Sequence, residues 1–170
     1  MGKNTFTSVL EDFNSVLWGC HLKVPDQIAL LYIIGNNRRV ICTLNDKESF
    51  HAGLLPNKEY GYFININKEI RKKLGLQIGD EVSVSLIKDE SKYGIAICEE
   101  FEMALEMDPV AADYFHDLTP GKQRSLIYIA SKPKRSETRL NKTMVILDFL
   151  KINEGLLDYK LLNQAFKTAG

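Results

Sequence analysis

The hydrophobic periodicity of this chain changes once, near residue 97 of 170. Before that point apolar side chains alternate with polar ones, as in Val-Ser-Val-Ser-Leu at 82–86, which is the pattern of a strand with one buried face. After it they recur every third or fourth position, as at 101–105, which is typical of amphipathic helices. We therefore expect an α+β protein with a β domain at residues 1–97 and an all-helical domain at residues 98–170.

One short helix is predicted inside the β region, over Lys68–Leu74. Asn67 can cap its first turn through the side-chain oxygen. Gly75 follows as a residue able to take the left-handed conformation, after which Leu76 can fold back onto Ile70. The local order is therefore strand, helix, turn, strand.

This unit has a second copy earlier in the chain. One constant shift superposes apolar positions of the two segments: Val24 on Ile66, Ile28 on Ile70, Val40 on Val82, Cys42 on Val84 and Leu44 on Leu86. The element order and the apolar phase agree in both segments, although few positions are identical and coincidence between two β-rich stretches is the alternative. We expect an internal duplication whose two copies close a small β-barrel and leave no free strand edge.

Two further expectations concern the β domain. The alternation of Tyr93, Ile95 and Ile97 predicts a last strand after a turn at residues 88–91. Trp18, the single tryptophan, is expected to pack into the barrel.

The second half carries helix start signals at regular intervals. Asp108-Pro109 and Thr119-Pro120 each read as an N-cap followed by a first-turn proline. Ser136 is expected to cap a longer helix, and residues 158–167 a short last one. The inward side chains predicted for the longer helix are Leu140, Met144, Leu147 and Leu150.

Charge is balanced overall but segregated locally. With 22 basic and 22 acidic residues the chain has no net field for capturing nucleic acid, so nucleic-acid binding is not favoured. Residues 99–117 hold seven acids without lysine or arginine, and residues 122–142 hold seven bases against Glu137 alone. Either the acidic helices supply counter-charge to the basic ones, or the basic segment binds a phosphate or carboxylate group. The anion contacts predicted on the second view are Lys122, Lys132, Arg135, Arg139 and Lys142.

Other chemistry finds little support in the sequence. Three widely separated cysteines, Cys20, Cys42 and Cys98, indicate a reducing compartment rather than disulfides, and Cys42 lies on an apolar strand face. We find no metal-ligand spacing and no nucleophile or phosphate-loop motif, so no metal, no cofactor and no catalytic residues are predicted. His116 is expected at the surface. Without an apolar run of about 20 residues or a signal segment, we expect a cytoplasmic protein that does not span a membrane.

Two family resemblances follow from particular residues. The stretch Ile66-Asn-Lys-Glu-Ile-Arg-Lys-Lys-Leu-Gly-Leu-Gln-Ile-Gly-Asp-Glu-Val-Ser-Val-Ser-Leu86 is similar to the swapped-hairpin half-barrel of AbrB-type transition-state regulators. Asn67 stands where those regulators usually have proline, which Val24-Pro25 retains in the first copy. The regulators complete their barrel by dimerising and contact DNA through arginines of the dimer, whereas here both copies lie in one chain.

Over nearly its whole length the chain resembles bacterial proteins that join a double-split β-barrel domain of unknown function to a YdeI/OmpD-associated, bacteriocin-protection helical domain. The residues that carry this resemblance are Ala104-Leu105, Asp108-Pro109, Phe115, Leu118 and Ser131-Lys-Pro-Lys-Arg-Ser-Glu-Thr-Arg139. Lys132, Thr138 and Arg139 match the most recognisable pattern of the helical domain. The resemblance implies a role in protection against antimicrobial peptides.

Three functions remain open from the sequence. The first is a non-catalytic binding protein with a basic, anion-binding face on the helical domain. The second is DNA binding through the AbrB-like barrel, and the third is a small-molecule enzyme with a site between the domains. The sequence predicts no oligomeric state.

Overall fold

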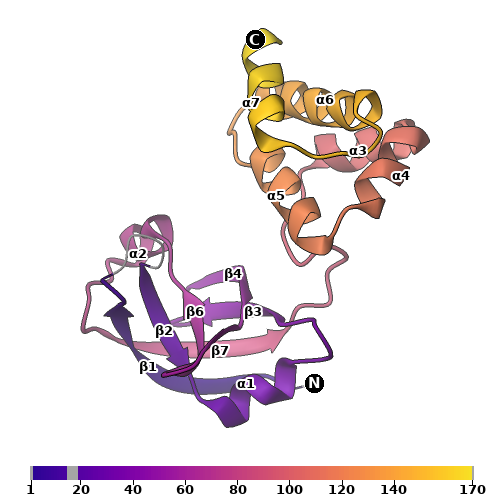
Figure 1. Ribbon diagram of the computed structural model, residues 1–170. Coiled ribbons are helices and arrows are strands. Elements are labelled where there is room, and N and C mark those ends of the chain that lie inside the picture. The colour runs from indigo at the N-terminus through magenta and orange to yellow at the C-terminus, as the bar shows by residue number, and fades with distance from the viewer. Residues whose placement is uncertain (1, 15–18, 170) are drawn as a thin grey trace. The chain divides into compact units, whose positions relative to one another are not determined.

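The computed structural model describes residues 2–14 and 19–169, so the expectation for Trp18 lies outside the described residues. The chain divides into two compact units, residues 1–90 and residues 91–170. The first, here called the sheet unit, holds every described strand, and the second, the helical unit, consists of helices and their connections (Figure 1). The α+β class predicted from the sequence is confirmed.

The sheet unit is one curled, antiparallel sheet with the strand order β4-β3-β7-β1-β2-β6-β5. Two short helices lie between its strands (Figure 1). The elements are β1 (Asn4–Asp12), β2 (Cys20–Val24), α1 (Asp26–Tyr32), β3 (Arg39–Leu44), β4 (Glu48–Gly53), β5 (Leu55–Asn57), β6 (Gly61–Asn65), α2 (Lys68–Leu74) and β7 (Glu81–Lys88).

The sheet curls because β1 changes partner along its length. Residues 4–9 of β1 pair with β7, and residues 10–12 pair with β2. The change falls at Leu10, which is fully buried. At the other end of the strand order, β4 and β5 are separated by Leu54 alone, which is also fully buried. The two outermost strands of the sheet are therefore consecutive in the chain.

The elements of the sheet unit recur as the sequence predicts. The order β2-α1-β3 is repeated by β6-α2-β7. The antiparallel pair β2/β6 contains Leu22 opposite Ile64, and the pair β3/β7 contains Thr43 opposite Ser85. In both cases the two paired residues are positions that the shift of Val24 onto Ile66 superposes.

The core of the sheet unit follows the alternation read from the sequence. Val82, Val84 and Leu86 are fully buried, and Val40, Cys42 and Leu44 of β3 are buried beside them. Ser85 is buried as well, and its hydroxyl forms a 2.9 Å hydrogen bond with the hydroxyl of Thr5. This bond satisfies the polar group, which would otherwise destabilise the core.

Helix α2 forms as predicted. The Asn67 side-chain oxygen accepts a 2.8 Å hydrogen bond from the Ile70 amide. Gly75 takes the left-handed conformation with φ 67°. Its N–H donates to Lys72 O, the Leu76 N–H donates to Arg71 O, and Leu76 packs against the core of the sheet unit. Such paired bonds satisfy carbonyls that the helix end leaves open.

The predicted strand at Tyr93, Ile95 and Ile97 is wrong. Residues 91–95 form bends, and Gly94 has φ 69°, which interrupts the extended backbone. The three apolar side chains pack against the core of the helical unit instead. Alternation over so few residues reports burial on one side, which an irregular segment can also provide.

The helical unit contains five helices in its described residues: α3 (Glu99–Met107), α4 (Pro109–Asp117), α5 (Pro120–Ser131), α6 (Ser136–Ile152) and α7 (Tyr159–Thr168). The predicted caps of α4 and α5 are present, because Asp108 accepts from the Ala111 amide at 3.0 Å and Thr119 from the Lys122 amide at 3.5 Å. Phe101, Phe115 and Leu126 are fully buried in its core. None of the helices in residues 2–14 and 19–169 is long and apolar enough to cross a membrane.

Two predictions about α6 are wrong. Ser136 is the first helical residue and makes no capping bond, because its hydroxyl donates to the Glu100 carboxylate of α3. Leu140 and Met144 are each 46% exposed rather than inward. The buried stripe of α6 is rotated from the predicted one and comprises Thr143, Ile146, Leu147, Phe149 and Leu150.

Candidate functional site

The five predicted anion contacts all belong to the helical unit, where they lie in α5, the α5–α6 connection and α6. Lys122 is exposed in the first turn of α5. Arg135 is the N-cap residue of α6 and therefore lies just outside the helix, so the expected helical face of Arg135, Arg139 and Lys142 is incomplete. The side chains of Arg139 and Lys142 contact different elements.

Arg139 is engaged within the unit. Its Nε and Nη2 donate to the two Glu100 carboxylate oxygens at 2.9 and 2.7 Å. Its Nη1 donates to the carbonyls of Pro133 and Lys134 at 3.2 and 2.8 Å. The guanidinium thus joins α3, the α5–α6 connection and α6 through a bidentate, charge-assisted pair.

The same contacts set the ionisation of this pair. Hydrogen bonds from Arg139 and then from Ser136 lower the pKa of Glu100 to about 2. The hydrogen bond with Glu100 raises the pKa of Arg139. Glu100 and Arg139 therefore remain an ion pair far into the acid range.

A second pair links the acidic segment to α6. The Lys151 ammonium lies 2.6 Å from the Asp108 carboxylate and 3.1 Å from that of Asp148. The hydrogen bond from Lys151 lowers the pKa of Asp108. Glu100 therefore supplies counter-charge to Arg139 of the basic segment, as the first of the two explanations for the segregated charge expects, whereas the partner of Asp108, Lys151, lies outside residues 122–142.

Two of the predicted cations rest on aromatic rings. The Lys132 ammonium lies 5.4 Å from the ring centroid of Tyr128, and the Lys142 ammonium lies 5.5 Å from that of Phe166. Cation–π contacts of this kind hold a charge near the surface without neutralising it. The Lys142 side chain contacts α7 and the Lys132 side chain contacts α5, so the two lysines pack against different helices.

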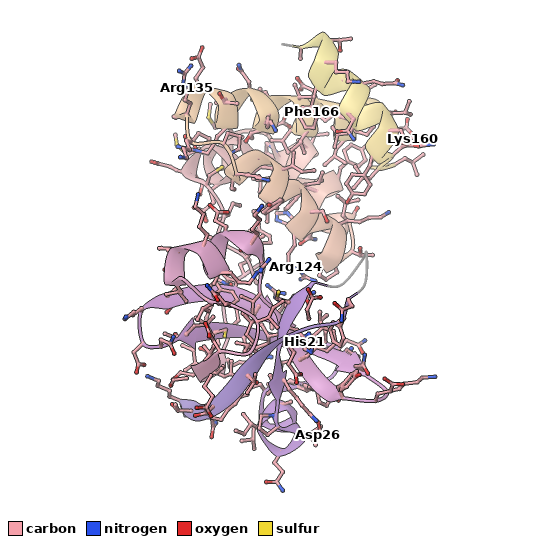
Figure 2. The ribbon with its side chains drawn as sticks, turned by 90° about the vertical axis from the view of Figure 1, so that its left-hand side faces the viewer. His21, Asp26, Arg124, Arg135, Lys160 and Phe166 are labelled. Atoms are coloured by element: carbon pink, nitrogen blue, oxygen red, sulfur yellow. The ribbon has the colours of Figure 1, made fainter. Side chains whose placement is uncertain are left out.

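The connection between α5 and α6 gathers the remaining charge. Lys132, Lys134 and Arg135, here called the basic loop, are all exposed. Among the ion pairs between described residues, none involves these three side chains. Figure 2 shows Arg135 at the start of α6, at the edge of the helical unit. Glu100 is linked to this loop through Arg139, and its carboxylate already accepts hydrogen bonds from Arg139 and Ser136.

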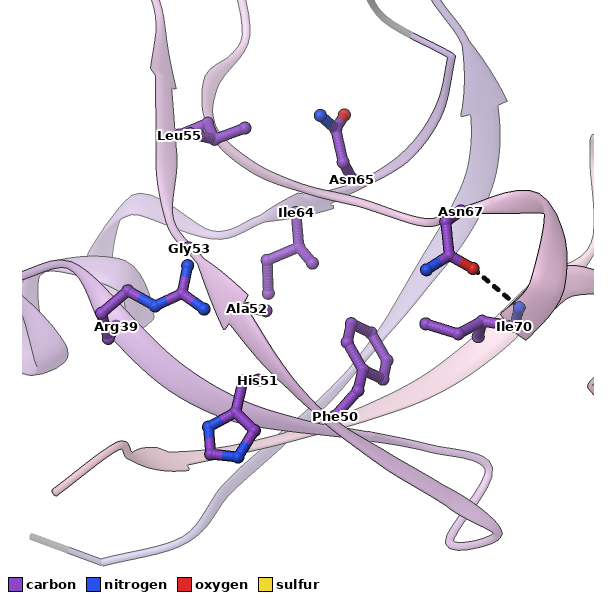
Figure 3. Close-up of a pocket in the computed structure, with 10 residues that line it drawn as sticks. All are labelled: Arg39, Phe50, His51, Ala52, Gly53, Leu55, Ile64, Asn65, Asn67 and Ile70. Atoms are coloured by element: carbon purple, nitrogen blue, oxygen red, sulfur yellow. Dashed lines mark hydrogen bonds between the residues drawn. The ribbon is translucent and has the colours of Figure 1, made fainter. Parts of the chain in front are cut away.

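The sheet unit contains a pocket that the sequence did not predict. It has a volume of about 240 Å³ and lies among β3, β4, β5, β6 and α2 (Figure 3). Its polar lining residues are Arg39, His51, Asn65 and Asn67, and its apolar ones include Phe50, Ile64 and Ile70. In Figure 3 Arg39 and Asn67 lie on opposite sides of the pocket, with the Asn67 oxygen directed to the Ile70 amide.

His51 is oriented by a buried acid. Its Nδ1 lies 2.8 Å from Oδ2 of Asp89, whose side chain is 1% exposed. Because an ionised carboxylate can only accept a hydrogen bond, Nδ1 carries the proton and donates. Nε2 is then the ring nitrogen that can meet a ligand.

The position predicted for Cys42, on an apolar strand face, is confirmed. Cys42 is fully buried, and burial raises the pKa of its thiol to about 12. A thiol so rarely ionised is a poor nucleophile and a poor metal ligand. Within the described ranges, no group of three or more His, Cys, Asp or Glu side chains could hold a metal ion.

His116 is exposed, as predicted, and its Nε2 lies 3.0 Å from the Tyr93 hydroxyl.

Comparison with protein families divides the chain in the same order as the fold. Residues 6–86, in the sheet unit, match the family described as a domain of unknown function (DUF1905). Residues 95–151, in the helical unit, match the family described as bacteriocin-protection, YdeI or OmpD-associated. A comparison with curated proteins found no match.

Proposed function

We propose that this chain, which carries an N-terminal DUF1905 domain and a C-terminal YdeI/OmpD-associated, bacteriocin-protection domain, is a non-catalytic binding protein. Its ligand is an anionic group, a phosphate or a carboxylate, and the contact surface is the basic loop of the helical domain. The supporting observation is that Lys132, Lys134 and Arg135 are exposed while Glu100, the neighbouring acid, is already paired with Arg139. The loop carries three cations beside one further acid, Glu137 in the first turn of α6, so it keeps an excess of positive charge.

The five predicted residues have different parts in this proposal. Lys132 and Arg135 contact the ligand. Arg139 is a positioning residue, because it holds the loop through the Pro133 and Lys134 carbonyls. Lys122 and Lys142 add positive potential at longer range, since surface charges act over about 8–10 Å at physiological salt. In this view the binding activity supports protection against antimicrobial peptides, as the description of the C-terminal domain suggests.

A titration with inorganic phosphate, followed by ¹H–¹⁵N NMR, tests the proposal. We expect saturable shifts at residues 131–139 of the full chain, and a several-fold weaker affinity in the double variant Lys132→Ala/Arg135→Ala. The matched control is Lys160→Ala/Lys167→Ala, which removes two exposed cations from α7. Equal loss in both double variants, or no saturable shift with phosphate and acetate, would refute the basic loop as a specific site.

We further propose that the sheet domain is an internally duplicated double-split β-barrel. Two observations support this. The pairs Leu22/Ile64 and Thr43/Ser85 join equivalent positions of two copies, as expected around a pseudo-twofold axis. The outermost strands β4 and β5 are separated by Leu54 alone, so a single continuous segment pairs with both β3 and β6, as closure of the sheet into a barrel requires. Closure of this kind removes exposed strand edges.

DNA binding through the sheet domain is the second candidate, and the likeness of its strand–helix–strand unit to AbrB-type regulators favours it. The charge does not, because residues 1–90 contain 11 basic and 11 acidic residues. Gel shifts of a mixed-sequence duplex at rising salt decide the matter. Retention that falls steeply with salt supports DNA binding, and no retention at low salt excludes it.

A further inference from the structure

The outward side of α3 carries two methionines next to two glutamates. Met103 is 52% exposed and Met107 is 80% exposed, and the two side chains share one side of the helix because they are four positions apart. Glu102 and Glu106 are exposed and are likewise four positions apart, on the adjoining side of the helix. The helix therefore presents an apolar stripe beside an acidic stripe. These four residues are here called the acidic methionine face.

Packing of the helical unit does not account for this face. The residues that α3 buries are Phe101, Ala104 and Leu105, which lie on the opposite side of the helix. Glu106 stands in the last turn, where a negative charge opposes the helix dipole, and α3 has no basic residue in that turn to offset it. Glu102 and Glu106 also repel each other across one helical turn. The stability of α3 gains nothing from these charges, which points to a role in binding.

The acids of the face have no internal counter-charge. Among the ion pairs between described residues, none involves Glu102 or Glu106. Residues 99–117, which include all of α3 and α4, contain no lysine or arginine. Lys151, which pairs with Asp108 at the corner between those helices, is itself neutralised by two carboxylates. Charge complementarity therefore requires a cationic partner for this face.

The methionine stripe narrows the partner further. Methionine is flexible and polarisable, and it is common on surfaces that accept apolar side chains of varied shape. A basic amphipathic helix has the complementary pattern, an apolar stripe for Met103 and Met107 beside a row of lysines or arginines for the glutamates. An anionic membrane surface would be repelled by the glutamates. The basic loop of a second copy would supply the cations of Lys132, Lys134 and Arg135 but no apolar stripe.

We propose that the acidic methionine face binds a basic amphipathic peptide helix, whose apolar stripe packs on Met103 and Met107 and whose cations pair with Glu102 and Glu106. Helix α3 has 9 residues, about 13.5 Å of helix, so the contact covers about two and a half turns of the bound peptide. The basic loop lies between α5 and α6, on other elements, so this inference does not rest on the function proposed for that loop.

Fluorescence anisotropy with synthetic peptides tests the proposal on the full chain. The probe is a labelled peptide of leucine and lysine whose leucines recur with the helical period. Its two comparison peptides are a scrambled version and a version with glutamate in place of lysine. We expect saturable binding of the probe, binding at least about fivefold weaker for the scrambled peptide, and none for the acidic one. The affinity for the probe should fall as salt rises, because salt screens charge pairs at a surface.

Two double variants locate the binding on α3. Glu102→Gln/Glu106→Gln should raise the Kd about fivefold or more and flatten its salt dependence, because it removes the charges that attract the peptide. Met103→Gln/Met107→Gln should raise the Kd by a similar factor and keep the salt dependence, because it removes apolar contact and no charge. All four positions are exposed, so both variants should keep the circular dichroism spectrum of the wild type.

The matched control removes the same charge from another part of the chain. Glu59→Gln/Glu69→Gln replaces two exposed glutamates of the sheet unit and should alter the Kd less than about twofold. The proposal is overturned if the probe shows no saturable binding, if the scrambled peptide binds equally well, or if this control weakens binding as much as Glu102→Gln/Glu106→Gln.

Sedimentation velocity of the chain alone tests the other occupant. Self-association that is abolished both by Glu102→Gln/Glu106→Gln and by Lys132→Ala/Arg135→Ala would place the basic loop of a second copy on the face, and would also overturn the proposal. A monomer at all concentrations supports it. Lys132→Ala/Arg135→Ala should leave the Kd of the probe unchanged, so the peptide site and the anion site of the basic loop can fail independently.

Discussion

Thr143 is the clearest place at which one substitution should stabilise this protein. Its side chain lies in the buried stripe of α6, is fully inaccessible to solvent, and its hydroxyl has no hydrogen-bond partner among the described residues. Burying an unpaired hydroxyl costs about 1–3 kcal/mol. Thr143→Val replaces that hydroxyl with a methyl group of similar size. We expect the helical unit to gain about 1–2 kcal/mol, or roughly 5–10 °C in Tm for a unit of this size.

The assay is urea unfolding followed by circular dichroism at 222 nm, where the helical unit dominates the signal. Thr143→Ser tests the other half of the reasoning, because it keeps the hydroxyl and removes a buried methyl group, which should cost about 1 kcal/mol. Thr138→Val at an exposed position of α6 is the control and should change stability by less than about 0.5 kcal/mol. The order Val, Thr, Ser is the expected ranking at position 143. A valine variant no more stable than the wild type would show that the hydroxyl is satisfied, and would refute the argument.

Three further changes test other parts of the structure. Glu100→Gln should destabilise the helical unit most above pH 4.5 and progressively less toward pH 2, because the folded pKa of Glu100 lies near 2, below its ordinary 4.5. A difference between the urea midpoints of wild type and variant that does not change with pH would contradict this. Gly61→Ala should cost more than about 1 kcal/mol in thermal unfolding, since Gly61 has φ 74° and a Cβ there would collide with the Asp26 carboxylate. Equal stability would show that the start of β6 and the Asp26 side chain can shift to make room. Cys42 should resist alkylation at pH 8 until urea unfolds the sheet unit, because the pKa of its thiol is raised to about 12. Alkylation of Cys42 in the folded protein, read by peptide mass spectrometry, would argue against its burial.

Much of the fold could be predicted because its signals are local. The alternation at 82–86 and the caps of α2 depend on residues within a few positions of one another, and both are present in the structure. The strand expected at Tyr93 is absent because its signal was also local. A short alternation cannot distinguish a strand from an irregular segment whose apolar side chains meet a nearby helical core.

The candidate sites were harder to predict because they depend on contacts between distant residues. Arg139 could be recognised as a conspicuous cation, but its pairing with Glu100, 39 residues away, is set by how α3 packs against α6. The buried face of α6 was also predicted wrongly. Leu140 lies in the exposed first turns of the helix, and the buried stripe starts at Thr143. The residues that line the sheet-unit pocket come from four strands and a helix, and no motif along the chain joins His51 to Asn67.

The interleaving of the sheet has a consequence for synthesis on the ribosome. Thr5 hydrogen-bonds to Ser85, 80 positions later, so residues 4–9 of β1 have no strand partner until β7 has been made. Contacts of such long range slow folding, and at about 5–20 residues per second the nascent segment stays unpaired for several seconds. The helical unit, whose helices follow one another closely in the chain, has no comparable delay. Chaperones that bind nascent chains should therefore engage the sheet unit far longer than the helical unit.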